Sequence, residues 1–135
     1  ARTVAHAIFR YEREHVANDS TYWLYFELLW REFFRWRAVI DGQSLFRQGG
    51  RSGRRPLATF EPRHFARWCA GDTDYPLVNA LMRQLVATGW MSNRGRQIAA
   101  SCLIHELGLD WRYGAAFFEQ QLIDYDGGST DGNWE

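Results

Sequence analysis

The clearest chemical signal in the sequence is a polar run that follows a predicted turn and opens a predicted helix. The run contains Asn93, Arg94, Arg96 and Gln97. In a helix Asn93 and Arg96 share one face, while Arg94 and Gln97 form a neighbouring pair. An Asn amide can both donate to and accept from the edge of a heteroaromatic ring, and an Arg beside a reducible ring stabilises an added electron. The cluster suits a site for an electron-accepting, partly anionic cofactor.

Two carboxylates further along the chain could complete such a site. Asp124 and Asp126 flank a single residue, and either could hold an arginine or accept the imide N–H of a flavin. A solvated helix end followed by a polar turn would explain the same residues, and by residue type alone it is the more frequent explanation. The spacing leaves both interpretations open.

Two tryptophans could supply electrons to a cofactor. Trp111 stands at a predicted helix start, and Trp134 lies near the last residue of the sequence. Indole is, with the phenol of Tyr, the most readily oxidised ordinary side chain. Core packing is the usual role of a Trp at a helix start and remains the alternative.

A further pair suits the binding of a nucleic-acid base. Glu27 and Trp30 are three residues apart in an aromatic-rich segment, so they share a face if that segment is helical. A carboxylate and an indole on one face can hydrogen-bond to and stack on a base extruded from its strand. A satisfied core pair is the alternative.

The elements that must position these residues are predicted to be helical. Apolar residues recur at helical spacing and no segment alternates like a strand, which predicts an all-α bundle. The first half is predicted to contain an amphipathic first helix, a polar cap at Asn18 to Ser20, a helix at 22–37 buried on most sides, a loop at 41–56 and a short helix at 62–70.

The second half is predicted to contain three more elements before a final loop. An apolar stripe from Val78 ends at Gly89, Ser92 caps a helix that runs through His105, and Asp110 caps the next. The glycine-rich run 127–133 is predicted to be loop. Five or more helices should pack around 22–37, with these side chains mostly buried: Trp23, Phe26, Leu81, Leu85, Leu103 and Phe118.

Composition sets broad limits on the protein class. The 135 residues are 46% hydrophobic, enough for one globular domain over residues 1–135, and the formal net charge of zero gives no general argument for nucleic-acid binding. Cys69 and Cys102 lack CxxC spacing, and no spanning or targeting segment is evident, so a cytoplasmic setting without membrane association is the expectation. HELGL at 105–109 lacks the second His of a zincin, so no metal site is predicted.

Five segments together resemble the flavin-binding end of the photolyase/cryptochrome family, most closely the DASH cryptochromes. They are TYWLYFELLWREFF at 21–34, GDTDYPLVNALMRQL at 71–85, TGWMSNRGRQIAA at 88–100, GLDWRYGA at 108–115 and QLIDYD at 121–126. The resemblance runs from about Asn18 to the end and implies an all-helical domain that holds FAD in a U-shape. Gln97 and the TYW before the aromatic segment point to the DASH group.

The resemblance also implies which residues meet the cofactor. Asn93 and Arg96 would contact the isoalloxazine ring, with Arg96 paired to Asp124. The other implied contacts are Arg31, Trp90 as a wall of the pocket, Asp126 near the ribityl region, and Thr130. Thr130 departs from the family, in which most members place an Asn beside the flavin N5, and Asn79 departs from the Asp of the family's PxVDA pattern.

A chain of electron-transfer tryptophans is implied as well. Trp134 would be nearest the flavin and Trp111 the middle member. The surface member is expected where this sequence has Ala58-Thr59-Phe60. Trp68 is the nearest tryptophan, and we do not assign it that role from the sequence.

The implied activity is light-driven splitting of pyrimidine dimers in DNA, favouring single strands. Glu27 and Trp30 would line the dimer pocket and act in catalysis, while Arg94 touches a phosphate and Gln97 faces the DNA. The alternatives are a blue-light photoreceptor without repair activity and a cofactor-free helical bundle. Because the family's antenna-binding α/β domain and phosphate-gripping loop have no counterpart in this sequence, we expect a longer parent protein that holds any antenna pigment elsewhere. The isolated chain is expected to bind FAD weakly and to be inactive.

Overall fold

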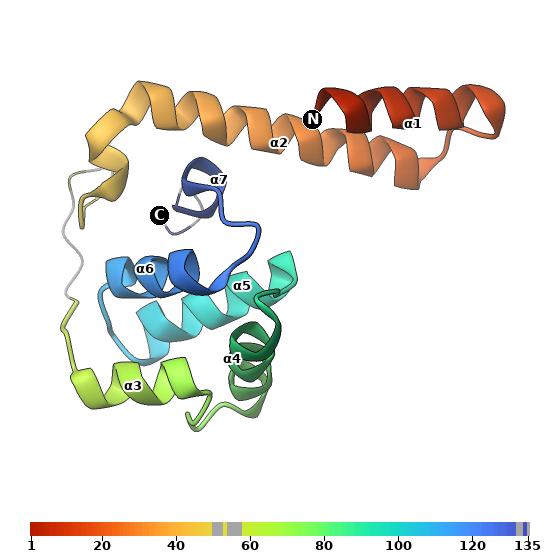
Figure 1. The fold of residues 1–135 in the computed structure, drawn as a ribbon. Helices are drawn as coiled ribbons and strands as arrows, with labels where there is room; N and C mark the ends of the chain where they lie inside the picture. The colour runs from red at the N-terminus through yellow and green to blue at the C-terminus, as the bar shows by residue number, and fades with distance from the viewer. Residues whose placement is uncertain (50–52, 54–57, 132–133, 135) are drawn as a thin grey trace.

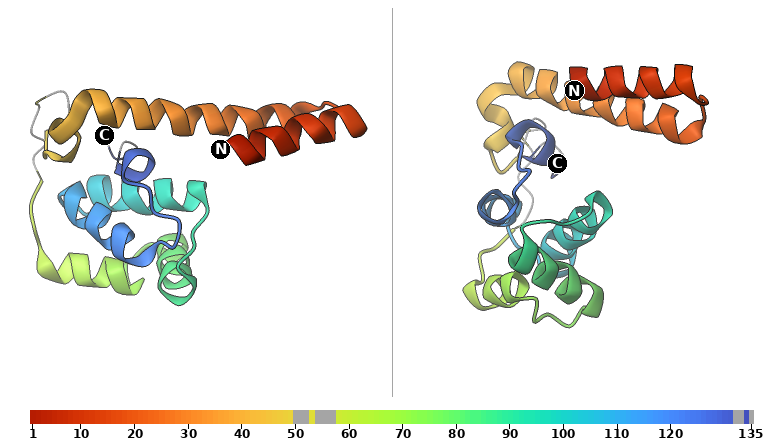
Figure 2. Two further views of the ribbon diagram at one scale, coloured as in Figure 1. Left: turned by 45° about the horizontal axis from the view of Figure 1, so that its top comes forward. Right: turned by 45° about the vertical axis from the view of Figure 1, so that its right-hand side comes forward.

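Two long helices form an antiparallel hairpin that extends beyond the other helices (Figures 1 and 2). The computed structural model describes residues 1–49, 53, 58–131 and 134, and the hairpin consists of α1 (Arg2–Glu14) and α2 (Asp19–Asp41). Asn18 caps α2 as predicted, because its side chain accepts from the Thr21 N–H at 3.1 Å while the Thr21 hydroxyl accepts from the Asn18 N–H at 3.1 Å. The same hydroxyl donates to Glu12 at 2.6 Å and ties the two helices together.

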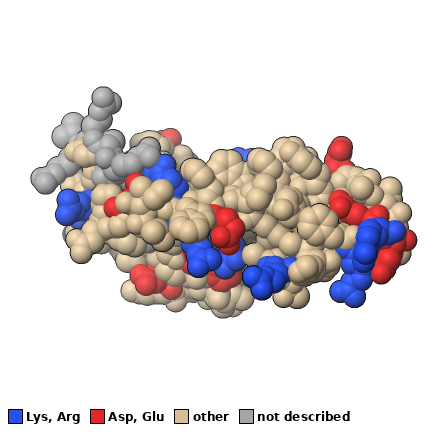
Figure 3. Space-filling model, turned by 90° about the horizontal axis from the view of Figure 1, so that it is seen from above, with Lys and Arg blue, Asp and Glu red and all other residues tan. Residues whose placement is uncertain are grey.

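The prediction that the 22–37 helix is buried on most sides is wrong for this chain. Trp23 is 57% exposed and Phe26 is only half-buried. The main neighbours of α2 are α1, α7 and the 3₁₀ turn at Gly42–Phe46, which cover part of its surface, and the face seen from above the hairpin is largely uncharged (Figure 3). An apolar pattern on every side predicts burial but does not say which element covers each side. Exposed apolar residues on α2 include Tyr22, Trp23, Leu24, Tyr25, Leu29, Trp30, Phe33, Trp36, Val39 and Ile40.

The hydrophobic core lies among the later helices instead. It is built by α3 (Pro62–Ala70), α4 (Pro76–Thr88), α5 (Asn93–Ser101) with a π-helical continuation at Cys102–Glu106, and α6 (Trp111–Gln121). Trp68, Met82, Leu85, Met91, Leu103, Leu109 and Phe118 are fully buried there. The all-α prediction is confirmed, and so is the burial of Leu85, Leu103 and Phe118, while Leu81 is half-buried.

Local caps decide where the helices of this core begin. The Ser92 hydroxyl accepts from the Gly95 N–H at 3.1 Å, and the Asp110 carboxylate accepts from the Arg112 N–H at 3.0 Å, as predicted. Burial raises the pKa of Asp110, but hydrogen bonds and charge from Arg112 outweigh it and hold that pKa below its usual value. The predicted helix through His105 changes to π geometry at Cys102, where the Leu107 N–H donates to the Cys102 carbonyl at 3.0 Å. Gly108, at φ 63°, then turns the chain toward α6.

The run after Asp126 is not the loop that its glycines predicted. Residues Gly127–Asp131 form the short helix α7, in which the Thr130 N–H donates to the Asp126 carbonyl at 2.7 Å. A Cβ at Gly128 would lie 3.6 Å from both the Ala38 Cβ and the Phe34 carbonyl oxygen of α2. The packing of α7 on α2 favours the helix despite the low helix propensity of its two glycines, as tertiary packing often does. Positions 50–52, 54–56, 132 and 133 of the two predicted loops lie outside the described residues.

No helix in residues 1–49 or 58–131 is long and apolar enough to cross a membrane. Across the described residues, no group of three or more His, Cys, Asp or Glu side chains is placed to hold a metal ion. The described β pairing is one isolated bridge between Thr59 and Leu109, which joins the segment before α3 to the segment before α6.

We expect Gly114→Val to destabilise the fold by about 1–3 kcal/mol, the usual cost of overpacking. A Cβ at Gly114 would overlap Leu103 Cδ2 and lie 2.6 Å from Trp134 Cη2, and the helix propensities of Gly and Val differ by well under about 1 kcal/mol. Urea denaturation measures the loss. Gln120→Val, at an exposed position of the same helix, is the matched control, and equal stability of the two variants would contradict the prediction.

Candidate functional site

Two adjoining cavities lie between α5, α2 and α7. The larger cavity, of about 570 Å³, is lined by Glu27, Trp30, Arg31, Phe34, Asn93, Arg96, Gln97, Asp124, Asp126 and Thr130. The smaller cavity, of about 120 Å³, is lined by Asn93, Arg96, Gln97, Ala100, Phe118, Thr130 and Trp134. Four residues line both, so the cavities form one recess whose size suits a small-molecule ligand, for which about 300–1,000 Å³ is typical.

An ion pair fixes the arginine at the centre of this recess. Arg96 Nη2 donates to both carboxylate oxygens of Asp124, at 2.8 and 2.9 Å, and Arg96 Nε donates to the Met91 carbonyl at 2.9 Å. The Arg96 side chain is 21% exposed and that of Asp124 is 52% exposed. The predicted pairing is therefore present, and it holds a cation at a defined position on the cavity wall.

One wall of the larger cavity comes from α2. Glu27, Trp30, Arg31 and Phe34 follow one another at positions i, i+3, i+4 and i+7, which places them on one face of that helix. Trp30 lines this cavity and is 45% exposed. Glu27 and Trp30, predicted to bind a base, thus line the same recess as most of the residues predicted to bind a cofactor: Arg31, Asn93, Arg96, Asp124, Asp126 and Thr130.

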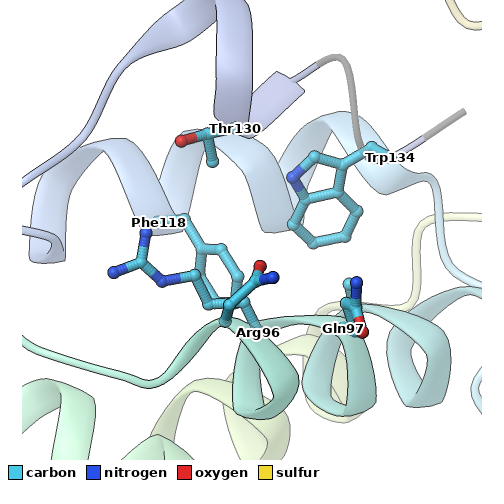
Figure 4. A pocket seen from close by; sticks show the side chains of 7 residues that line it. Arg96, Gln97, Phe118, Thr130 and Trp134 are labelled. Carbon is cyan, nitrogen blue, oxygen red and sulfur yellow. The ribbon is translucent and has the colours of Figure 1, made fainter. Parts of the chain in front are cut away.

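The opposite side is formed by Asp126, by Thr130 of α7 and by Trp134. Asp126 and Thr130 line the larger cavity. In the smaller cavity, Figure 4 shows Thr130 and Trp134 on one side and Arg96 and Gln97 of α5 on the other. The short helix that the sequence did not predict is the element that brings Thr130 to the site.

The two predicted donor tryptophans are in contact with each other. Trp134 is buried and lines the smaller cavity, whereas Trp111 does not. The two rings stack at 6.5 Å between centroids with a 30° interplanar angle. Trp111 Nε1 donates to the Gln48 carbonyl at 3.3 Å. If Trp134 donated an electron at the cavity, Trp111 is the neighbouring tryptophan that could replace it.

Besides Trp111, two predicted site residues, Trp90 and Arg94, lie outside both cavity linings. Trp90 is exposed and precedes the cap of α5, and its backbone N–H donates to the Thr88 hydroxyl at 3.1 Å. Its role as a wall of the cofactor pocket stays a prediction. Arg94 is one position beyond Asn93 and therefore about 100° further around the helix. Arg94 Nη1 donates to Gln97 Oε1 at 3.1 Å and borders a separate groove.

That separate groove contains a hydrogen-bonded pair of its own. Besides Arg94 and Gln97 it is bordered by Tyr75 and Glu106, and the Tyr75 hydroxyl donates to Glu106 at 3.0 Å. This hydrogen bond raises the pKa of the Tyr75 phenol. Gln97 borders both the groove and the recess, so Arg94 lies next to the recess without lining it.

Three lining residues were not predicted as site residues: Phe34, Ala100 and Phe118. Their apolar types match ordinary core positions, so the sequence offered no signal for them.

Asn79, which stands where the family usually has Asp, has a structural role here. Its side chain makes three hydrogen bonds of 2.7 Å to Thr73 and holds the turn before α4.

Comparison with known proteins agrees with this geometry. The sequence model of the family described as "FAD binding domain of DNA photolyase" matches residues 23–135. Cryptochrome DASH of Vibrio parahaemolyticus is 62% identical over 131 residues, which are 96% of this chain and 29% of that protein. Cryptochrome DASH of Idiomarina loihiensis is 58% identical over 134 residues, 99% of this chain and 30% of that protein.

A solved structure shares the fold. The crystal structure of the Synechocystis cryptochrome aligns with a TM-score of 0.97 at 52% identity, over 98% of this chain and 28% of that one. The chain spans about 30% of the length of the two cryptochrome DASH proteins from Vibrio and Idiomarina. A family match over most of the chain, together with these identities, shows that the chain belongs to the photolyase/cryptochrome family, as part of its FAD-binding domain, and is of the DASH type.

Proposed function

We propose that the parent protein is a DASH-type photolyase, which uses FAD and light to split cyclobutane pyrimidine dimers in DNA, preferentially in single strands. This chain would supply the site for the flavin ring and for the dimer. The observation that carries the proposal is one recess with two chemically distinct walls. Glu27 and Trp30 form the wall suited to a base, and the Arg96–Asp124 pair forms the wall suited to an anionic ring.

The residues present fit a flavin ring. Arg96 supplies a fixed positive charge, the Asn93 amide can donate and accept, and the Thr130 hydroxyl can donate. Asp124 and Asp126 supply acceptors on the same cavity. When bound, FAD supplies the light-absorbing electron carrier. We assign the ring to Asn93, Arg96, Asp124, Asp126 and Thr130, with Arg31 as a further contact from α2.

With FAD bound, different residues of this chain would stabilise the ring, supply electrons and bind the base. Arg96, held by Asp124, offsets negative charge on the ring at short range, where a charge-assisted interaction is strongest. Trp134 and Trp111 place two oxidisable rings in a row behind the cavity. Glu27 can accept a hydrogen bond from a base, and the exposed ring of Trp30 can stack on it. Gln97 is at the edge of the recess and accepts a hydrogen bond from Arg94, and Arg94 would meet a phosphate of the same strand.

We expect Trp30→Ala in the parent to weaken binding of a dimer-containing single strand by about 1–3 kcal/mol, the usual contribution of base–aromatic stacking. Light-driven flavin reduction should persist, because Trp30 is on a different wall from Trp134. Fluorescence anisotropy with a labelled oligonucleotide measures the affinity, and a dimer-splitting assay measures repair.

Trp36→Ala is the matched control for this experiment. Trp36 is an exposed tryptophan of the same helix that does not line either cavity. If the two variants lost the same affinity, Trp30 would have no specific role in binding the dimer.

A blue-light photoreceptor without repair activity is the second candidate. It would use the same flavin wall and the same tryptophans, and the Thr130 that replaces the family's usual Asn is consistent with a changed redox role. The placement of Glu27 and Trp30 on the recess favours repair, because a sensor needs no base-binding wall. A parent that reduces its flavin in light but neither binds nor splits a dimer would support the photoreceptor instead.

A further inference from the structure

A row of aromatic rings leads from the smaller cavity into the core by a route that does not include Trp111. Phe118 lies 5.3 Å from Trp134 between ring centroids, and on its other side it stacks on Trp68 at 5.8 Å and 23°. Trp68 is fully buried, and its Nε1 donates to the Ala99 carbonyl at 3.1 Å. The indole of Trp68 is therefore one phenyl ring away from the indole at the cavity.

The same row continues from Trp68 to the protein surface. Phe65 stacks on Trp68 at 6.1 Å and 21°, and lies 5.9 Å from Tyr113. Tyr113 stacks on Phe60 at 4.2 Å and 28°. Tyr113 is 40% exposed and Phe60 is exposed as well. The row thus begins at the cavity and ends at a phenol in contact with solvent.

Backbone contacts hold the outer end of the row in place. The Thr59 N–H donates to the Gly108 carbonyl at 3.0 Å, and the Asp110 N–H donates to the Thr59 carbonyl at 3.2 Å. These bonds fix the segment that carries Phe60 against the start of α6, which carries Tyr113. The backbone on both sides of the Phe60–Tyr113 stack is therefore held in place by hydrogen bonds.

We propose that Tyr113 is the surface electron donor of this protein, and that Trp68 relays electrons from it to Trp134. Of the five rings in the row, Trp134, Trp68 and Tyr113 are readily oxidised, and Phe118 and Phe65 lie between them. The Trp111 branch is different: Trp111 is buried, and within the described residues its ring contact is with Trp134 alone. The proposal rests on the flavin of the proposed function but not on dimer repair.

The electrons and the proton balance along this row. With FAD bound at the proposed site, Trp134 would give one electron to the light-excited oxidised flavin and recover one from Trp68, which would recover one from Tyr113. Trp68 is fully buried and its N–H is bonded to a carbonyl, so its radical cation does not lose a proton to water and the hole moves on. Tyr113 releases its phenol proton to water as it is oxidised, which leaves a neutral tyrosyl radical at the surface.

The test is illumination of the full-length parent, supplied with excess FAD, followed by electron paramagnetic resonance. A nitroso spin trap with peptide mass spectrometry locates the radical. In the wild type we expect a tyrosyl signal and a trap adduct on Tyr113. Tyr113→Phe and Trp68→Phe should each lose both. Tyr75→Phe is the matched control, because Tyr75 is 39% exposed but bonded to Glu106 at the separate groove, and it should retain both.

Each outcome separates this inference from the proposed function. If flavin is reduced in light but the radical remains on tryptophan, or if Tyr113→Phe retains the tyrosyl signal, the inference is wrong while repair is unaffected. If the Tyr113 radical forms but dimers are neither bound nor split, the inference stands and the repair proposal fails. A parent in which light produces no radical at all contradicts the inference as well.

Discussion

Replacing Trp134 by Phe in the flavin-containing parent is expected to abolish most light-driven flavin reduction while leaving dimer splitting by chemically reduced flavin nearly intact. Trp134 is the oxidisable ring that lines the smaller cavity, and both aromatic routes out of that cavity begin at it: Trp111 at 6.5 Å and Phe118 at 5.3 Å. Phenylalanine keeps an aromatic ring in the buried position but is a poor electron donor. Dimer splitting should not depend on Trp134, because in the proposed function the dimer would receive its electron from the flavin at the other wall of the recess.

Flavin absorbance under blue light in the presence of an external reductant measures the first effect, and a splitting assay with dithionite-reduced protein measures the second. Trp90→Phe is the matched control, since Trp90 is an exposed tryptophan that does not line the recess. Unchanged photoreduction in Trp134→Phe would remove Trp134 from the electron path. Loss of both activities together with loss of flavin would show that Trp134 acts in binding.

Removing either partner of the Arg96–Asp124 pair should release most of the flavin from the parent. Each substitution leaves the other charge without its bidentate partner at the cavity wall. Hydrogen bonds to charged groups contribute about 1.5–3 kcal/mol, which corresponds to roughly 10- to 150-fold in Kd. The 52% exposure of Asp124 argues against the larger penalties of fully buried ion pairs.

Isothermal titration of FAD into apoprotein variants measures this loss, and the double variant Arg96→Ala/Asp124→Ala should cost less than the sum of the single changes. Arg67→Ala is the control: Arg67 Nη2 is 3.2 Å from Asp74 in an exposed pair, and such pairs typically contribute about 0–1 kcal/mol. Stoichiometric flavin with unchanged affinity in either single variant would show that the ring is held elsewhere.

Local physical chemistry made much of this structure predictable from sequence. A helix cap needs only its own side chain and the next few N–H groups, so Ser92, Asp110 and the run Asn18 to Ser20 that contains the third cap could be predicted without knowing any long-range contact. Helical periodicity likewise predicted the helix at Pro62–Ala70 and the buried stripes of the core. Residue types at 93–97 and 124–126 indicated the chemistry of the site, and the family resemblance paired Arg96 with Asp124.

Long-range packing decided what the sequence left open or predicted wrongly. Gly127–Asp131 is helical because it packs on α2, and its glycines gave the opposite prediction. The exposure of Trp23 depends on which elements cover α2. A sequence pattern that is apolar on every side of a helix does not identify those elements. The stack of Phe60 on Tyr113 joins residues from two segments whose spacing in sequence predicts no contact. Caps and periodicity are properties of neighbouring residues and can be predicted from sequence, whereas the shape of the recess and the aromatic row depend on where distant helices meet.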